Sequence, residues 1–157
     1  MSRTELVGWA KSAAGPLLRR FVLTVPPSAS GVHHARHVFR ALLHGWDEAP
    51  AAAAESAFAE VAANAFRHGR GRITVRVCLA PDWVRCDVRD GNWRFLRGRY
   101  QQYWHPRYER CWPGESGRGM VIVTALADRW GVRRRPLGKT VWFEVGSGNT
   151  SARECGY

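Results

Sequence analysis

The sequence predicts an α+β fold, a two-layer sandwich in which helices cover one face of a mostly antiparallel sheet. Apolar residues recur at helical spacing in two consecutive segments of the first half. Two alternating segments then flank a short turn, and a third helical segment precedes a closing hairpin. The 157 residues suffice for one compact domain but not for two.

The first strand is expected at residues 20–25, where an apolar run ends at Pro26. Proline cannot donate to a strand ladder, and it disfavours a helical residue before it. Ser28 or Ser30 can cap the next helix, which is expected to run to about His44. Its apolar residues are spaced for one face: Val32, Ala35, Val38, Phe39 and Leu42.

The second helix is expected at residues 51–67, a segment rich in alanine and free of glycine and proline, and it ends at Gly69. One broad face is apolar: Phe58, Val61, Ala62, Ala65 and Phe66. The segments 73–79 and 83–90 alternate with a period of two around a turn at 80–82. They therefore predict an antiparallel hairpin.

Residues 92–116 show no periodicity and are expected to form a long loop, which in a compact domain is usually functional or mobile. A helix over 117–128 then opens at two closely spaced glycines. Strands over 129–135 and 139–145 are expected to close the sheet as a second hairpin.

The ordered domain is expected at residues 20–145, between a loosely ordered tail over 1–19 and a disordered tail over 146–157. No apolar run approaches the roughly 18–20 residues of a membrane span, and the N-terminal segment lacks the apolar core of a secretory signal. A cytoplasmic protein without a membrane partner is therefore expected. The four cysteines form no Cys-x-x-Cys pair, so they give a zinc site little support, and Cys78 and Cys86 are interpreted as buried thiols.

The charge balance indicates an anionic partner. There are 24 basic and 13 acidic residues, which gives a net charge of +11. Nucleic acid, an acidic protein surface and a polyphosphate ligand would all satisfy this charge, so it does not choose between them.

Polar residues form a stripe on the otherwise apolar second helix. Glu60, Asn64 and His68 are spaced four residues apart, which places them on one face. A carboxylate and an amide oxygen on a rigid face suit a hydrated Mg²⁺ ion, especially when phosphates supply its other ligands. The alternative is an ordinary solvated face.

Asp90 falls in phase with the apolar residues of the second hairpin strand. Val84, Cys86 and Val88 point to one face of the sheet, and the charged residues between them point to the other. A carboxylate at the core end of a strand needs a donor, because an unpaired buried charge is costly. The exocyclic amine of adenine would be such a donor, and a nearby arginine is the alternative.

The segment 114–120, GESGRGM, places glycines and unpaired backbone amides at the start of a helix. Such a helix N-terminus is a natural site for phosphate. The alternative is that these glycines merely turn the chain.

The 92–116 loop interleaves aromatic rings with positive charge. This composition suits single-stranded nucleic acid, a protein-docking surface or a loop that buries its own rings, and the last two are favoured because nucleic-acid binders carry the pattern on strands. The residues are Trp93, Phe95, Tyr100, Tyr103, Trp104, Tyr108 and Trp112, with Arg94, Arg97, Arg99, Arg107 and Arg110.

Five segments in order resemble the GHKL (Bergerat-fold) ATPases, and most closely their branch of anti-sigma regulatory factors with serine/threonine kinase activity. EVAANAFRHG at 60–69 resembles the N box, DVRDGN at 87–92 the first glycine box, and GRGMVIV at 117–123 the second. ADRWGV at 127–132 and GKTVWFEV at 138–145 resemble the closing hairpin of that family. The ordered combination is more specific than any single motif.

The resemblance implies a Bergerat-type fold, an ATP lid at about 92–116, and ATP and Mg²⁺ as cofactors. It makes Glu60 the general base, Asn64 the Mg²⁺ ligand and Asp90 the acceptor for the adenine amine. The nucleotide-binding residues it implies are Asn64, Arg67, His68, Asp90, Gly91, Asn92, Gly117, Arg118, Gly119, Met120, Lys139 and Thr140.

Two positions depart from the family pattern. Trp93 stands where the first glycine box usually has a further glycine, and Lys139 stands on the core-side face of the last strand where the family often has a small hydroxyl residue. The strand period turns Thr140 to the opposite face, so Lys139 is the better candidate to reach a phosphate.

The function implied by the resemblance is that of a protein serine/threonine kinase that phosphorylates an anti-sigma-factor antagonist and sequesters a sigma factor. Its partners would then be those two proteins, and the family also allows a homodimer. Trp93 and Lys139 support the alternative of a non-catalytic, nucleotide-gated binding module. A basic nucleic-acid-binding protein is the least favoured alternative, based on the net charge and the aromatic loop.

Overall fold

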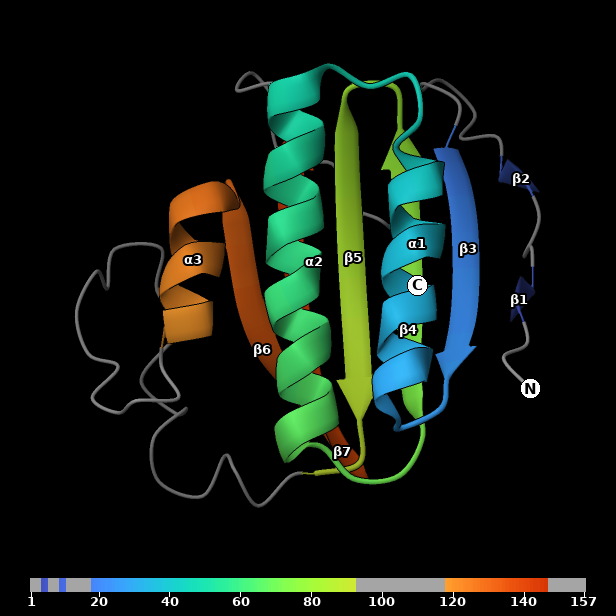
Figure 1. The fold of residues 1–157 in the computed structure, drawn as a ribbon, viewed down its shortest axis with the longest axis vertical. Helices are drawn as coiled ribbons and strands as arrows, with labels where there is room; N and C mark the ends of the chain where they lie inside the picture. Colours follow the sequence, from blue (N-terminus) through green and yellow to red (C-terminus); the bar gives the residue numbers. More distant parts are fainter. Residues whose placement is uncertain (1–3, 6–8, 11–17, 93–117, 147–157) are drawn as a thin grey trace.

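The computed structural model describes residues 4–5, 9–10, 18–92 and 118–146, and it has an antiparallel sheet with helices packed on one face (Figure 1). The strands follow the order β1-β3-β4-β5-β7-β6, with β2 also paired to β3, and every pairing is antiparallel. This confirms the predicted fold class. The elements are β1 (Thr4–Glu5), β2 (Trp9–Ala10), β3 (Leu18–Val25), α1 (Ala29–Leu42), α2 (Glu48–His68), β4 (Ile73–Ala80), β5 (Trp83–Asp90), α3 (Arg118–Leu126), β6 (Arg129–Arg135) and β7 (Gly138–Gly146).

The helix boundaries follow from local chemistry. Ser28 caps α1, because its side-chain oxygen accepts a hydrogen bond from the amide of Gly31 at 3.1 Å. Helix α2 begins at Glu48, earlier than the expected residue 51. Pro50 lies in its first turn, where a missing amide donor costs nothing, so the proline does not delay the helix.

Parts of the expected tails and loop fall outside the described residues. The segments 93–117 and 147–157, which hold most of the expected lid and C-terminal tail, are among them. In the expected N-terminal tail, two dipeptides pair with β3 as β1 and β2. No helix in the described part of the chain is both long and apolar enough to span a membrane.

The core lies between the helices and the sheet and centres on three aromatic rings. The Phe39 ring of α1 stacks on Phe58 of α2 with centroids 4.4 Å apart, and it meets Phe143 of β7 edge-on at 6.3 Å. All three side chains are fully buried. Phe66 is an exception to the predicted apolar face of α2, because it is 38% exposed.

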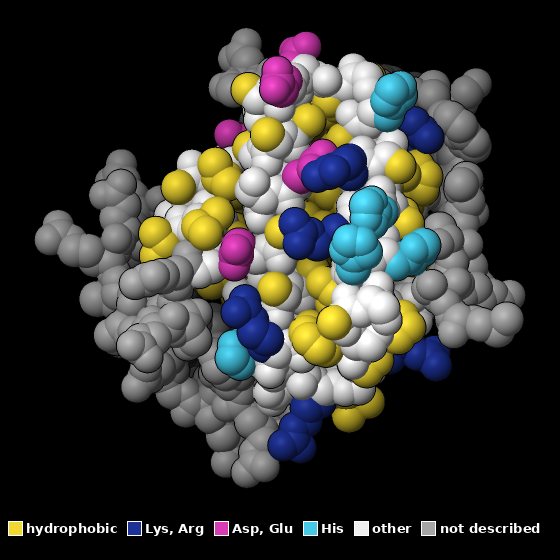
Figure 2. All heavy atoms as spheres, in the orientation of Figure 1, with side chains coloured by type: hydrophobic (Ala, Val, Ile, Leu, Met, Phe, Trp, Pro, Cys, Tyr) yellow, Lys and Arg dark blue, Asp and Glu magenta, His cyan; other side chains and the backbone are white. Residues whose placement is uncertain are grey.

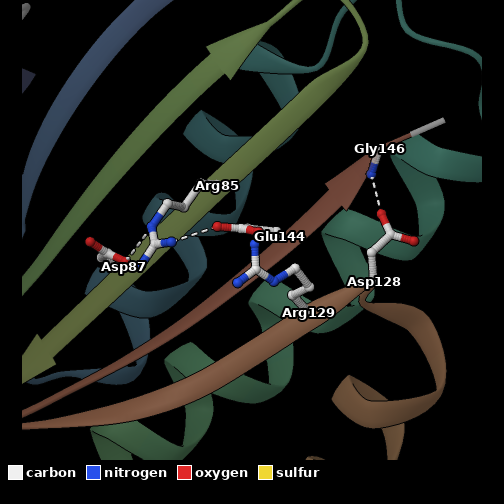
Figure 3. Close-up of polar contacts among 6 residues, drawn as sticks. All are labelled: Arg85, Asp87, Asp128, Arg129, Glu144 and Gly146. Carbon is white, nitrogen blue, oxygen red and sulfur yellow. Dashed lines mark hydrogen bonds and ion pairs between the residues drawn. The ribbon is translucent and has the colours of Figure 1, made fainter. Parts of the chain in front are cut away.

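The opposite face of the sheet carries buried charged side chains. The Arg85 guanidinium forms ion pairs with Asp87 at 3.2 Å and Glu144 at 2.5 Å (Figure 3). It also lies 4.2 Å above the Trp142 ring. Arg129 of β6 reaches the same glutamate at 3.6 Å. The two pairs with Glu144 tie β5 and β6 to β7, because Arg85 and Arg129 lie directly opposite this glutamate on the neighbouring strands.

The two cysteines of the central hairpin differ. Cys86 is a free thiol, and burial raises its pKa well above the usual value, with the neighbouring Asp87 charge adding to the effect. It is therefore an inert core residue, as expected. Cys78 is disulfide-bonded, so the expectation of a thiol is wrong there. Sequence spacing carries no information on such a pairing.

We expect Phe58→Ala to lower the free energy of unfolding by about 3–5 kcal/mol, because it removes the ring that stacks on Phe39 and leaves a cavity under α2. Urea denaturation measures the change. Leu137→Ala is the control, since Leu137 is 77% exposed in the β6–β7 turn. A loss below about 1 kcal/mol for Phe58→Ala would contradict this description of the core.

Candidate functional site

The candidate site lies where the C-terminal end of α2 meets the end of β5. The amide of Gly91 donates to the carbonyl of Arg70 at 2.8 Å, which fixes the segment after α2 to the segment after β5. A Cβ at Gly69 would lie 2.9 Å from the Cβ of Asp90 and 2.1 Å from the carbonyl oxygen of Ala65. Only glycine allows this approach, so the helix end directly adjoins Asp90.

Asp90 forms a buried ion pair with Lys139. The two side chains are cross-strand partners on β5 and β7, and the residues are 2% and 5% exposed. The lysine Nζ lies 2.8 Å from Oδ2 and 3.0 Å from Oδ1 of the carboxylate. The structure thus brings Lys139 to the adenine-binding aspartate of the expected site, and this pairing was not predicted.

The two carboxylate oxygens of Asp90 differ in their hydrogen bonds. Oδ1 accepts hydrogen bonds from Lys139 and, at 2.8 Å, from the backbone amide of Asn92. Oδ2 is buried and, despite its close approach to Lys139 Nζ, it has no hydrogen bond of good geometry. A buried oxygen of this kind is the acceptor that an exocyclic amine would complete.

The turn between β6 and β7 closes one side of the site. Gly138 has φ +148°, and a Cβ there would lie 1.9 Å from the carbonyl oxygen of Asp90. A larger residue would push the hairpin away from β5. The glycine therefore sets the position of Lys139, which follows it directly in the strand.

The start of α3 lies against the polar stripe of α2. A Cβ at Gly119 would lie 2.5 Å from Oε2 of Glu60 and 3.4 Å from Nδ2 of Asn64. Glu60 and Asn64 are both partly exposed. Two segments that resemble the N box and the second glycine box, about 60 residues apart in sequence, are thus neighbours in the structure.

The other expected site residues are placed as follows. Asn92 Nδ2 donates a short hydrogen bond to the carbonyl oxygen of His68, which ties the first glycine box to the end of α2. Arg67 is exposed, and Met120 is buried in the core. Thr140 lies on the opposite sheet face, away from Asp90, in agreement with the strand period. Gly117 and the side chain of Arg118 lie outside the described residues.

These residues fit a bound nucleotide. Oδ2 of Asp90, which accepts no hydrogen bond of good geometry, suits an adenine amine, and the close approach of Gly119 to Glu60 leaves backbone rather than side chain at the start of α3. Among the described residues, no three His, Cys, Asp or Glu side chains group to hold a metal ion. A Mg²⁺ ion at Asn64 would therefore need phosphate oxygens and water as its remaining ligands.

The family comparison agrees with this geometry. The family model described as "Histidine kinase-like ATPase domain" matches residues 25–145, well over half of the chain. The chain belongs to this family, and the match supports the GHKL-type ATPase superfamily and an ATP-binding domain. No curated protein matches the sequence.

A groove of about 610 Å³ runs over the helix-covered face between α1, α2 and α3 (Figure 2). Glu60 lines this groove, so its carboxylate faces both the groove and the start of α3. Histidine and arginine side chains of α1 form the opposite wall: His33, Arg36, His37 and Arg40. Sequence reasoning missed this groove, because its walls come from three separate helices.

We expect Lys139→Met to destabilise the fold by about 3–5 kcal/mol, because it leaves the Asp90 carboxylate buried without a cation. Adding Asp90→Asn to Lys139→Met removes that charge and restores most of the loss. Urea denaturation of the two single variants and the double variant measures the coupling. Additive losses would show that the pair does not interact as described.

Proposed function

We propose that this protein is an ATP-dependent serine/threonine kinase that phosphorylates an anti-sigma-factor antagonist and sequesters a sigma factor. The family match supports ATP binding, and the resemblance of the motifs to the anti-sigma branch supports the kinase activity and the partners. The observation that carries the proposal is the contact of Glu60 with the start of α3, beside Asn64 and at the edge of an open groove.

In this proposal ATP, bound with Mg²⁺ at Asn64, supplies the phosphoryl group for a serine hydroxyl of the partner. Asp90 orients the adenine through Oδ2, while the ion pair with Lys139 fixes the position of the carboxylate. Glu60 accepts the proton of the serine hydroxyl that approaches from the groove. The start of α3 presents backbone amides to the phosphates, because no side chain intervenes at Gly119.

The second candidate is a non-catalytic, nucleotide-gated binding module. The position of Lys139 favours this second candidate, because its Nζ pairs with Asp90 rather than facing a phosphate site. In that case ATP would order the binding surface without transferring a phosphoryl group. The cytoplasmic location, the homodimer and the two protein partners stay part of the proposal.

We expect Asp90→Asn to weaken ATP binding at least about tenfold, since the change removes the charged acceptor and leaves Lys139 without its partner. Titration calorimetry with ATP, with and without Mg²⁺, measures the affinity. Asp82→Asn is the matched control, because Asp82 is exposed in the β4–β5 turn. Equal ATP affinity of wild type and Asp90→Asn would contradict the assignment of this aspartate.

We expect Glu60→Gln to lower phosphotransfer by about 10²–10⁴-fold while ATP affinity stays close to that of wild type, because a general base acts in transfer and not in binding. Labelled γ-phosphate from ATP, offered with antagonist proteins from the same genome, measures transfer. Glu48→Gln, at the exposed start of the same helix, is the control. Intact ATP binding without transfer from the wild type would favour the gated module instead.

A further inference from the structure

Two histidines stand side by side on the exposed face of α1. His33 and His37 are four residues apart, so their side chains lie one above the other on the helix. Their Nε2 atoms are 2.9 Å apart, and the ring centroids are 4.4 Å apart in an edge-on arrangement. Figure 2 shows histidine side chains gathered over α1, on the same face as the groove.

The distance between the two nitrogens matches that of a chelate. Imidazole nitrogen binds Zn²⁺ at roughly 2.0–2.1 Å, so two nitrogens on one ion at 90–110° are about 2.9–3.4 Å apart. In the structure one Nε2 donates to the other. When both rings carry their proton on Nδ1, no proton lies between the two Nε2 atoms. Both Nε2 lone pairs can then bind one metal ion.

We propose that His33 and His37 form a binding site for a divalent transition-metal ion of the Cu²⁺, Ni²⁺ and Zn²⁺ class. These ions prefer imidazole, whereas Mg²⁺ prefers oxygen ligands, so this site differs chemically from the expected Mg²⁺ position at Asn64. The helical spacing of the pair is rigid, because both residues lie inside the fourteen-residue helix α1.

The surroundings determine how the ion is held. Both histidines line the groove, where Glu55 and Glu60 of α2 offset the charge of Arg36 and Arg40 on α1. Arg40 is drawn toward α2 by its ion pair with Glu55 at 2.8 Å. Among the described residues no three His, Cys, Asp or Glu side chains form a metal-binding group, so this part of the chain supplies two ligands and water can fill the other coordination positions.

Titration calorimetry of the full-length, tag-free protein with CuCl₂, NiCl₂ and ZnCl₂, without nucleotide, tests this proposal. The variants are His33→Gln, His37→Gln and the double change. His34→Gln is the matched control, because His34 is exposed on the same helix but does not line the groove. The four variants change only the exposed residues His33, His34 and His37. Circular dichroism verifies that each variant is folded.

We expect one ion per chain at this pair, with Cu²⁺ bound most tightly. His33→Gln and His37→Gln each weaken that affinity at least about tenfold, while His34→Gln leaves it unchanged. Electron paramagnetic resonance of the Cu²⁺ form then shows nitrogen coupling that the double variant lacks. Equal metal affinity in wild type and the double variant, or no binding by the wild type, would overturn the proposal.

Discussion

The ion pair between Asp90 and Lys139 is the constraint on which the candidate site depends. Two opposite charges buried at the edge of the core are costly to desolvate, and an apolar pair would stabilise the fold at least as well. The surrounding backbone is built to accommodate them: Gly138 approaches the carbonyl of Asp90, and Asn92 donates its amide to Oδ1. Because strand register sets Lys139 beside the carboxylate, the position of Asp90 is fixed at the point where the proposed adenine contact would form.

The helix α2 connects this constraint to the rest of the domain. Its apolar face carries Phe58 into the core, and the same helix presents Glu60 and Asn64 to the start of α3. Its end is fixed to β5 through the Gly91 amide. A single rigid element therefore positions the proposed base, the proposed metal ligand and the aspartate, so that a shift of α2 against the sheet would disturb all three at once.

Local patterns in the sequence were enough to predict the element order from β3 onward, the antiparallel hairpins and the burial of Asp90, but not the short strands β1 and β2. They failed where a residue's surroundings come from distant segments. The alternation of β5 predicts that Arg85 and Asp87 face away from the helices, but not that Glu144 and Trp142 of β7 bury them. The sequence pattern likewise does not predict that Lys139 forms an ion pair with Asp90, or that the Asn92 side chain donates to the His68 carbonyl. The expected start of α2 at residue 51 left out its first turn, which contains Pro50, because the prediction was based on a segment free of proline, whereas the first turn of a helix tolerates proline.

The position of Glu60 bears on the choice between a kinase and a gated module. A module that only closes around ATP needs the aspartate and the phosphate-binding turn, but it has no use for a carboxylate that faces an open groove. Glu60 is partly exposed, lines that groove and contacts the start of α3, where phosphate would lie. A base in phosphoryl transfer must reach both the phosphate and the incoming hydroxyl, and this is the one described carboxylate placed between the two. The geometry thus supports the proposed transfer to a partner that enters along the α1–α2 face, with Lys139 beside the proposed adenine contact.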